Sequence, residues 1–234
     1  MTGTSLSVRV DALLTGRAKP YTRAGSFSGI DKFPLSSSVH ISELGLDGDE
    51  QGDPRVHGGQ DKAVHHYPFQ HYARWQEELG SLSLLQARGA FGENISTHGL
   101  DEGNVCIGDQ FALGDALLEV SQGRQPCWKL NDRFDVPDMA RRMQSTGRTG
   151  WYYRVLQAGS ATAGDVLELK SRPFPEWTLR RLGILLFERV LEPAALEPAL
   201  QLPLVQSWRK LVERRLQHCE VEDWHRRIDG PPAR

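Results

Sequence analysis

The sequence predicts a closed antiparallel β-barrel, mainly β with inserted helices, followed by a small C-terminal appendage of three helices. Three observations lead to this prediction. Up to residue 172 the apolar segments are short, glycine turns separate them, and only two segments show helical spacing. After Arg172-Pro173-Phe174-Pro175, Leu, Trp and Arg recur at helical spacing. We therefore expect residues 1–172 to form the barrel domain and residues 173–234 to form a helical domain.

The predicted strands are short and bounded by turn residues. From Val8 to Leu14 apolar residues alternate with others, which predicts a strand with one buried face. Residues 21–38 are rich in Ser, Gly and Pro and predict a surface loop. Gly114-Asp115 predicts a hairpin between two of the later strands. These later strands are predicted at residues 39–41, 110–113, 116–120, 151–156 and 166–170.

Two helices are predicted within the barrel domain. One begins at Pro68, in a favoured first helical position, and is stopped by Gly80. The other begins at Val136 and ends at Gly147. Three further helices, separated by prolines, are predicted at residues 176–190, 192–201 and 204–227. So small a helical unit is not expected to be stable alone, and it should dock on the barrel.

Composition limits the classes of function. The chain has 234 residues, of which 39% are hydrophobic and 25% charged, as in an ordinary globular protein. Its net charge of −2 provides no general field for nucleic acid or an anionic membrane, so neither is expected as a partner. No signal-peptide pattern or membrane-spanning apolar run is visible. Cys106, Cys127 and Cys219 form no CxxC pair or disulfide framework, which favours a reducing cytoplasm.

One cysteine follows a predicted strand and is flanked by cations. Cys127 stands between Arg124 and Lys129, shortly after the apolar run at residues 116–120. Such surroundings favour the thiolate, which is the form that attacks electrophiles and binds metals. An inert packing cysteine is the alternative that the local sequence leaves open.

A polar, glycine-rich segment from His57 to His65 is the second candidate. Gly58 and Gly59 allow a ligand to approach the backbone, and Lys62 adds a charge that suits phosphate or another anion. A solvated turn has the same composition. The chain contains neither a P-loop pattern, nor GxGxxG after a strand, nor a GxSxG elbow.

Other polar residues have weaker local signals. His65, His66 and His71 lack the paired spacing of a metal site such as HExxH, so ring packing or hydrogen bonding is favoured. Glu93, which precedes Asn94, is either an acid–base group near the site or a turn residue.

Short motifs follow one another in a fixed order within residues 30–172. They are Glu43 to Gln51, Val56-His57-Gly58-Gly59, Asp61-Lys62-Ala63, His66-Tyr67-Pro68, Phe91-Gly92-Glu93-Asn94, Ile107-Gly108-Asp109, Val120-Ser121-Gln122 with Arg124, Pro126-Cys127, Lys129-Leu130-Asn131, Thr146-Gly147-Arg148 and Gly150-Trp151. In this order they resemble the MOSC-domain family, named for the C-terminal domain of molybdenum cofactor sulfurase. Within it they are most similar to the YiiM branch, which reduces 6-hydroxylaminopurine and related N-hydroxylated compounds. The helical tail resembles that branch's three-helix extension.

The resemblance implies a barrel that holds a molybdopterin-type molybdenum cofactor, with Cys127 as the protein's sulfur ligand to the metal. It implies Glu93 and His57 as further catalytic residues. The implied cofactor-binding residues are Gly58, Gly59, Lys62, Asn94, Ser121, Arg124, Lys129 and Asn131. A soft thiolate suits a transition metal, and the cations suit a pterin phosphate.

The function implied is a reductase of small N-hydroxylated substrates. Electrons are expected from a separate flavoprotein reductase, and a homodimer is the expected assembly. Two other hypotheses remain at this point. One is a carrier that holds the molybdenum cofactor or sulfur on Cys127 without turnover, and the other is a metal-free hydrolase that uses Cys127 with His57.

Overall fold

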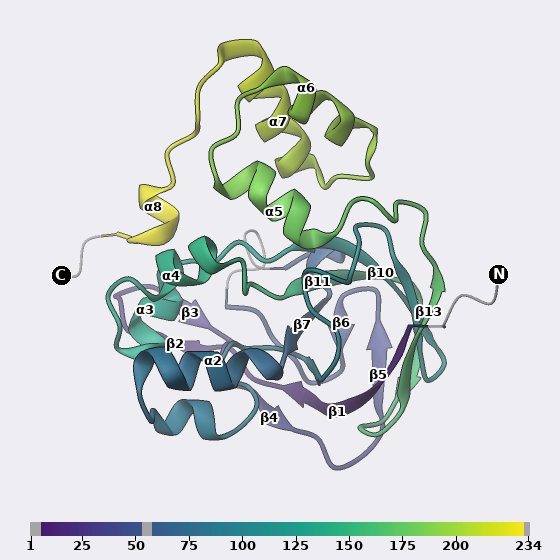
Figure 1. Ribbon diagram of the computed structural model, residues 1–234. Helices are drawn as coiled ribbons and strands as arrows, with labels where there is room; N and C mark the ends of the chain where they lie inside the picture. The colour runs from purple at the N-terminus through teal and green to yellow at the C-terminus, as the bar shows by residue number, and fades with distance from the viewer. Residues whose placement is uncertain (1–5, 53–57, 232–234) are drawn as a thin grey trace.

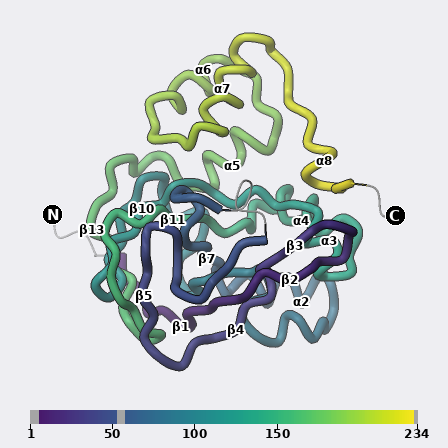
Figure 2. Tube along the Cα trace, turned by 180° about the vertical axis from the view of Figure 1, so that it is seen from behind, coloured from purple at the N-terminus to yellow at the C-terminus, as the bar shows by residue number. Residues whose placement is uncertain are grey.

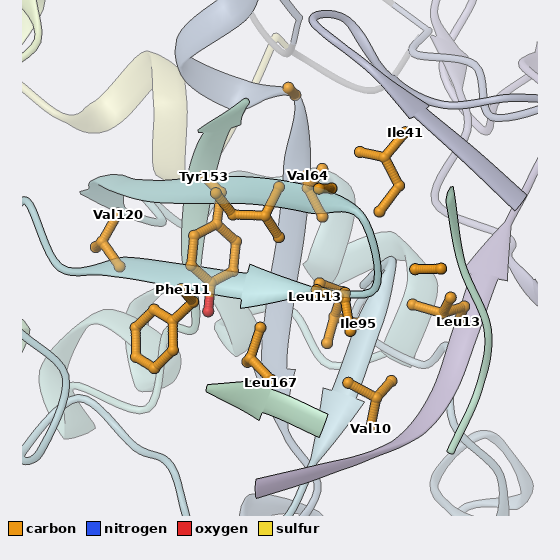
Figure 3. Packing of buried hydrophobic residues seen from close by; sticks show 14 of the residues in the cluster. Val10, Leu13, Ile41, Val64, Ile95, Phe111, Leu113, Val120, Tyr153 and Leu167 are labelled. Carbon is orange, nitrogen blue, oxygen red and sulfur yellow. The ribbon is translucent and has the colours of Figure 1, made fainter. Parts of the chain in front are cut away.

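Seven strands close into a barrel in the computed structural model, which describes residues 6–52 and 58–231 (Figure 1). Their order is β13-β9-β10-β11-β7-β8-β1, and the pairing of β1 with β13 closes the barrel. The strands are β1 (Ser7–Thr15), β7 (Val64–Pro68), β8 (Ile95–Thr97), β9 (Gln110–Leu113), β10 (Ala116–Gly123), β11 (Trp151–Gln157) and β13 (Val166–Ser171). Their alternating side chains fill the interior, where Leu13, Phe111 and Leu167 pack together (Figure 3).

The prediction of a purely antiparallel barrel is wrong, because β7 and β8 run parallel. His66 pairs with Ile95 and Pro68 with Thr97 in this register. Parallel neighbours need a crossover connection. Here α2 (Gln70–Leu79) and a short 3₁₀ helix (Ser83–Gln86) supply it. The barrel is therefore mixed.

Two other predictions inside the barrel domain need correction. Pro68 is the last residue of β7 and does not begin a helix, which starts two residues later. A third helix, α3 (Lys129–Phe134), accompanies the predicted α4 (Met139–Thr146). Because α3 is so short, its apolar spacing covers less than two turns and gives no clear period.

The predicted surface loop, residues 21–38, also contains short strands. β3 (Phe27–Ser28) forms a hairpin with β2 (Lys19–Pro20), which directly precedes the loop, and β4 (Phe33–Pro34) pairs with the end of β1. A separate three-stranded sheet consists of β5 (Val39–Ser42), β6 (Gly45–Leu46) and β12 (Gly159–Ala161).

The C-terminal helices lie over one end of the barrel (Figure 1). They are α5 (Leu179–Phe187), α6 (Pro193–Leu196) with a 3₁₀ extension (Glu197–Gln201), α7 (Gln206–His218) and α8 (His225–Ile228). The predicted third helix is broken at Cys219, whose φ of 52° is left-handed. After the break the chain returns to the barrel, and α8 lies beside α3 and α4 in both views (Figure 2). Within the described ranges, none of the helices combines the length and apolar character needed to cross a bilayer.

Arg215 on α7 is a buried arginine that connects α7 to α5 and to the segment after α7. Its contacts lead to a prediction about the stability of the fold. Arg215 has a fully buried side chain that donates to the carbonyls of Leu185 and Leu186 and forms an ion pair with Glu222 at 2.8 Å. Arg215→Ala orphans these acceptors, so we expect the free energy of unfolding to fall by about 3–5 kcal/mol. Denaturant unfolding checks this, with exposed Arg214→Ala as the matched control. Equal stability of the two variants would contradict the prediction.

Candidate functional site

Cys127 lies where two cavities meet. The inner cavity, of about 80 Å³, is lined among others by residues 28–30, 50–52 and 91–92 and by Lys32 and Asn94. The outer cavity, of about 1030 Å³, opens between the β2–β3 hairpin and residues 223–231. The residues that line both are Gly52, Lys62, Cys127, Lys129 and Tyr152. The half-buried Cys127 thiol is thus accessible from two sides.

The end of β10 places this thiol as the sequence predicts, at the end of a strand. The Arg124 N–H donates to the Gly150 carbonyl at 2.9 Å, and the Leu130 N–H donates to the Cys127 carbonyl at 2.9 Å. Cys127 therefore lies in the short connection between β10 and α3. By contrast, Cys106 is buried away from the cavities, and burial raises the pKa of its thiol to about 11.

Arg124 is a buried cation at the wall of the inner cavity. Its guanidinium donates to the Phe91 carbonyl at 2.8 Å. The loop that presents this carbonyl is held by the Glu93 carboxylate, which accepts the Tyr72 hydroxyl at 2.5 Å and the N–H groups of Gly89 and Phe91. Glu93 faces this loop and lines neither cavity. The structure therefore gives it a positioning role toward Arg124.

A buried ion pair stands at the wall of the inner cavity, which Lys32 lines. The Lys32 ammonium is 2.5 Å from the Asp49 carboxylate, and both side chains are less than one-tenth exposed. Asp49 also accepts the Gly16 N–H and the Asn94 amide, each at 2.9 Å. Asn94 in turn accepts the His65 N–H at 3.0 Å. Burial lowers the pKa of Lys32, and Asp49 opposes this effect.

His65 presents an acceptor that has no partner among the described residues. Its Nδ1 is 3.1 Å from the Gly92 carbonyl, and since a carbonyl only accepts, Nδ1 carries the proton. Burial, aided by Arg124, lowers the pKa of His65 well below 6.5, so the ring is neutral. Its Nε2 is therefore a buried lone pair without a hydrogen bond. Such orphaned atoms are uncommon and mark a place for a ligand or water.

Lys62 ends a short 3₁₀ helix, η1 (Gln60–Lys62), that is fixed to the barrel. Gly59 precedes it with a φ of 91°, a conformation that glycine adopts without strain. Ser121 donates to the Asp61 carbonyl at 2.6 Å, and so holds η1 in place without lining a cavity. Burial lowers the pKa of Lys62, and the nearby Cys127 opposes this effect. Lys62 and the thiol are thus close enough to interact.

Lys129 and Asn131 have different roles, although both lie on α3. Lys129 lines both cavities and donates to the Phe27 carbonyl at 2.6 Å. Asn131 is buried, donates to the Ile228 carbonyl at 2.9 Å and accepts the Ala140 N–H at 2.7 Å. It therefore joins α3, α4 and α8 and supports the site from behind.

The structure brings together about half of the residues predicted from the sequence. Those that line a cavity are Lys62, Asn94, Arg124, Cys127 and Lys129. Those described away from the cavities are Gly58, Gly59, Glu93, Ser121 and Asn131, and His57 lies outside the described residues.

The cavity lining also contains residues that the sequence did not single out as pocket residues, notably Lys32, His65 and Tyr152. The only signal for Lys32 was a charge in a Ser- and Gly-rich loop. His65 and Tyr152 belong to neighbouring strands and pair across β7 and β11. Their meeting point depends on strand order, which local sequence does not contain.

His66 and His71, for which ring packing or hydrogen bonding was predicted, form hydrogen bonds through their ring nitrogens. His66 bonds Tyr153 at 3.0 Å and Thr97 at 2.8 Å, while His71 bonds Glu102 at 2.8 Å. In the part of the chain that the structure describes, no group of three or more His, Cys, Asp or Glu side chains is arranged to hold a metal ion.

The donor set fits a molybdopterin-type cofactor. A single soft thiol suits a metal that brings its other ligands with it. The cations Lys62, Arg124 and Lys129 around the thiol suit an anionic phosphate. The orphaned Nε2 of His65 is an acceptor available to a ring N–H.

Comparison with known proteins gives the family. The MOSC domain model matches residues 53–168, and the YiiM-like, 3-alpha helix domain model matches residues 177–218. Protein YiiM of Escherichia coli (strain K12) is 40% identical over 217 residues, which cover 92% of this chain and 96% of that protein. A protein named Reductase from Gibberella moniliformis (strain M3125 / FGSC 7600) is 38% identical over 203 residues, which cover 86% of this chain and 36% of that protein.

Solved structures of YiiM proteins have the same fold as this chain. The crystal structure of YiiM from Escherichia coli has a TM-score of 0.80 at 34% identity and covers 95% of this chain and 98% of that one. YiiM from Geobacillus stearothermophilus has a TM-score of 0.76 at 33% identity, with coverages of 89% and 99%. The chain therefore belongs to the MOSC-domain family and to its YiiM-like branch.

Proposed function

We propose that this protein is a molybdenum-cofactor-dependent reductase of N-hydroxylated compounds such as 6-hydroxylaminopurine. One observation carries the proposal: the Cys127 thiol lies at the junction of a cation-lined inner cavity and a large outer cavity. The YiiM-like family and the relative named Reductase support it. An outer cavity of about 1030 Å³ has room for a ligand of substrate size beside the thiol.

The proposal assigns roles to the residues around the thiol. Cys127 would ligate molybdenum, and Arg124 and Lys129 would hold the pterin phosphate. When bound, the cofactor supplies a two-electron redox centre. The reaction is R–NHOH + 2 e⁻ + 2 H⁺ → R–NH₂ + H₂O, in which the N–O bond breaks and the oxygen leaves as water. The substrate reaches this point through the outer cavity.

The chain must supply protons to the departing oxygen. Glu93 faces its own loop, so it is poorly placed for this task. Lys62 lines both cavities, and burial lowers the pKa of its ammonium. A lowered pKa makes the ammonium a better acid at neutral pH. We therefore assign Lys62 as the proton-bearing cation next to the thiol.

This assignment predicts the pH dependence of the reaction. Lys62 is mostly protonated at pH values below its pKa, and burial lowers this pKa from the usual 10.5. We therefore expect kcat/KM to fall as the pH rises through this lowered value. In Lys62→Arg the decline should move to higher pH, because a guanidinium stays protonated. An unchanged alkaline limb in Lys62→Arg, measured by steady-state kinetics, would refute the assignment.

Electrons are proposed to come from a separate flavoprotein reductase, because the sequence has no dinucleotide-binding GxGxxG pattern. The carrier alternative differs in one testable respect. Metal-loaded protein, given an artificial electron donor and 6-hydroxylaminopurine, should convert the hydroxylamine to the amine over many turnovers. A carrier would consume none of it, and a metal-free cysteine hydrolase would form no amine and would need neither molybdenum nor the electron donor.

A further inference from the structure

The C-terminal segment 223–230 contacts the backbone on both sides of Cys127. The Trp128 N–H donates to the Arg227 carbonyl at 2.8 Å. The Arg227 guanidinium donates to the Pro126 carbonyl on the other side. Arg227 therefore contacts both the residue before Cys127 and the residue after it. Arg227 lies outside both matched regions, residues 53–168 and 177–218.

Three further contacts anchor this segment to the barrel. The Arg227 guanidinium also donates to the Gln144 side chain on α4 at 2.6 Å. The Asn131 amide donates to the Ile228 carbonyl at 2.9 Å, and Arg23 donates to the Asp229 carbonyl at 2.9 Å. The segment is thus bound to α3, to α4 and to the hairpin that walls the outer cavity. These contacts fix its path past Cys127.

Arg227 also borders the same space as the thiol. The residue lines the outer cavity together with Cys127 and Lys129.

We propose that Arg227 is a positioning residue for Cys127. It fixes the backbone before and after the cysteine. The barrel alone therefore does not complete the cysteine site, and the segment beyond α7 is part of it. This inference concerns the protein's own thiol, so it stands or falls separately from the bound cofactor and its reaction.

The reactivity of the Cys127 thiol tests this proposal without turnover. The full chain, produced in a host without the cofactor, is alkylated with iodoacetamide at several values from about pH 6 to about pH 9, and the site is identified by mass spectrometry. A Cys219→Asn background removes the exposed cysteine, since Asn tolerates the left-handed conformation at that position. The variants are Arg227→Ala, Arg227→Lys and, as the matched exposed control on α7, Arg214→Ala.

The informative quantity is the alkylation rate of Cys127 relative to the parent at each pH. We expect this rate to rise about threefold or more in Arg227→Ala, because the released backbone exposes the half-buried thiol, and to be largely restored in Arg227→Lys, which keeps a donor for the Pro126 carbonyl. Arg214→Ala should match the parent.

Hydrogen exchange measures whether Arg227 holds the backbone next to Cys127. Hydrogen exchange at the Trp128 N–H should accelerate in Arg227→Ala but not in Arg214→Ala. An Arg227→Ala protein with the parent's unfolding midpoint, the parent's alkylation rate and the parent's exchange rate would overturn the proposal. If Arg227→Ala does not fold, Arg227→Met replaces it. It keeps an apolar stem and removes the donors to Pro126 and Gln144, so alkylation and exchange rates equal to those of Arg227→Lys would overturn the proposal.

Discussion

Cys127→Ser should lose essentially all molybdenum-dependent reductase activity while keeping its fold. Replacing a residue that only supports a metal ligand typically costs about 10- to 100-fold, and loss of the ligand itself should exceed this. The half-buried thiol makes no contribution to the apolar core clusters, so the unfolding midpoint should change little. Steady-state reduction of 6-hydroxylaminopurine measures the first effect, and denaturant unfolding measures the second.

The other cysteines provide matched controls. Cys106 is buried away from both cavities and Cys219 is exposed, so Cys106→Ala and Cys219→Asn should retain activity. If Cys127→Ser were as active as these controls, the thiol would not be the metal ligand. Loss of activity in all three would point to a general effect of cysteine replacement and would also count against the account.

The second large effect is expected from Asp49→Ala. The Asp49 carboxylate pairs with the Lys32 ammonium, and the two side chains are 2% and 7% exposed. Removing one partner leaves a charge buried without compensation, which costs about 3–5 kcal/mol. The Asn94 amide also loses one of its two acceptors at the wall of the inner cavity and keeps the Leu14 carbonyl. We therefore expect a matching loss in the free energy of unfolding.

The pH dependence of this loss distinguishes a buried charge from a packing defect. Burial lowers the pKa of Lys32 in the folded state below 10.5, so the unfolded state binds more protons than the folded state near that pH. Stability therefore rises with pH through this range, and without Asp49 the rise should be steeper. The exposed pair Arg74–Glu77 is the control, because Glu77→Ala should change the free energy of unfolding by less than about 1 kcal/mol. A pH-independent loss in Asp49→Ala would contradict this explanation.

The sequence predicted those parts of the fold that depend on local pattern. The alternation from Val8 to Leu14 and the Gly114-Asp115 turn correspond to β1 and to the β9–β10 hairpin. The parallel pairing of β7 with β8 was missed because strand direction depends on the long crossover, and Pro68 suits the end of a strand as well as the start of a helix.

For the site, local chemistry singled out Cys127, which stands among cations, and Lys62, which follows two glycines, as separate candidates. The family resemblance implied that they share one pocket, and both residues line the two cavities. Local chemistry could not show that the Glu93 carboxylate turns into its own loop, since side-chain direction depends on tertiary contacts. Arg227 was invisible for a further reason. It lies 100 residues from Cys127 in the sequence, and only the fold brings its guanidinium to the Pro126 carbonyl.

The central claim is that Cys127 holds a molybdenum cofactor, and metal content tests it most directly. The wild-type chain and Cys127→Ser are produced in a host that makes the cofactor, and molybdenum and pterin are measured per chain by elemental analysis and fluorescence. The account predicts molybdenum and pterin in a one-to-one ratio in the wild type, and strongly reduced molybdenum in Cys127→Ser. Wild-type protein without molybdenum or pterin, or a Cys127→Ser protein with full metal content, would contradict it.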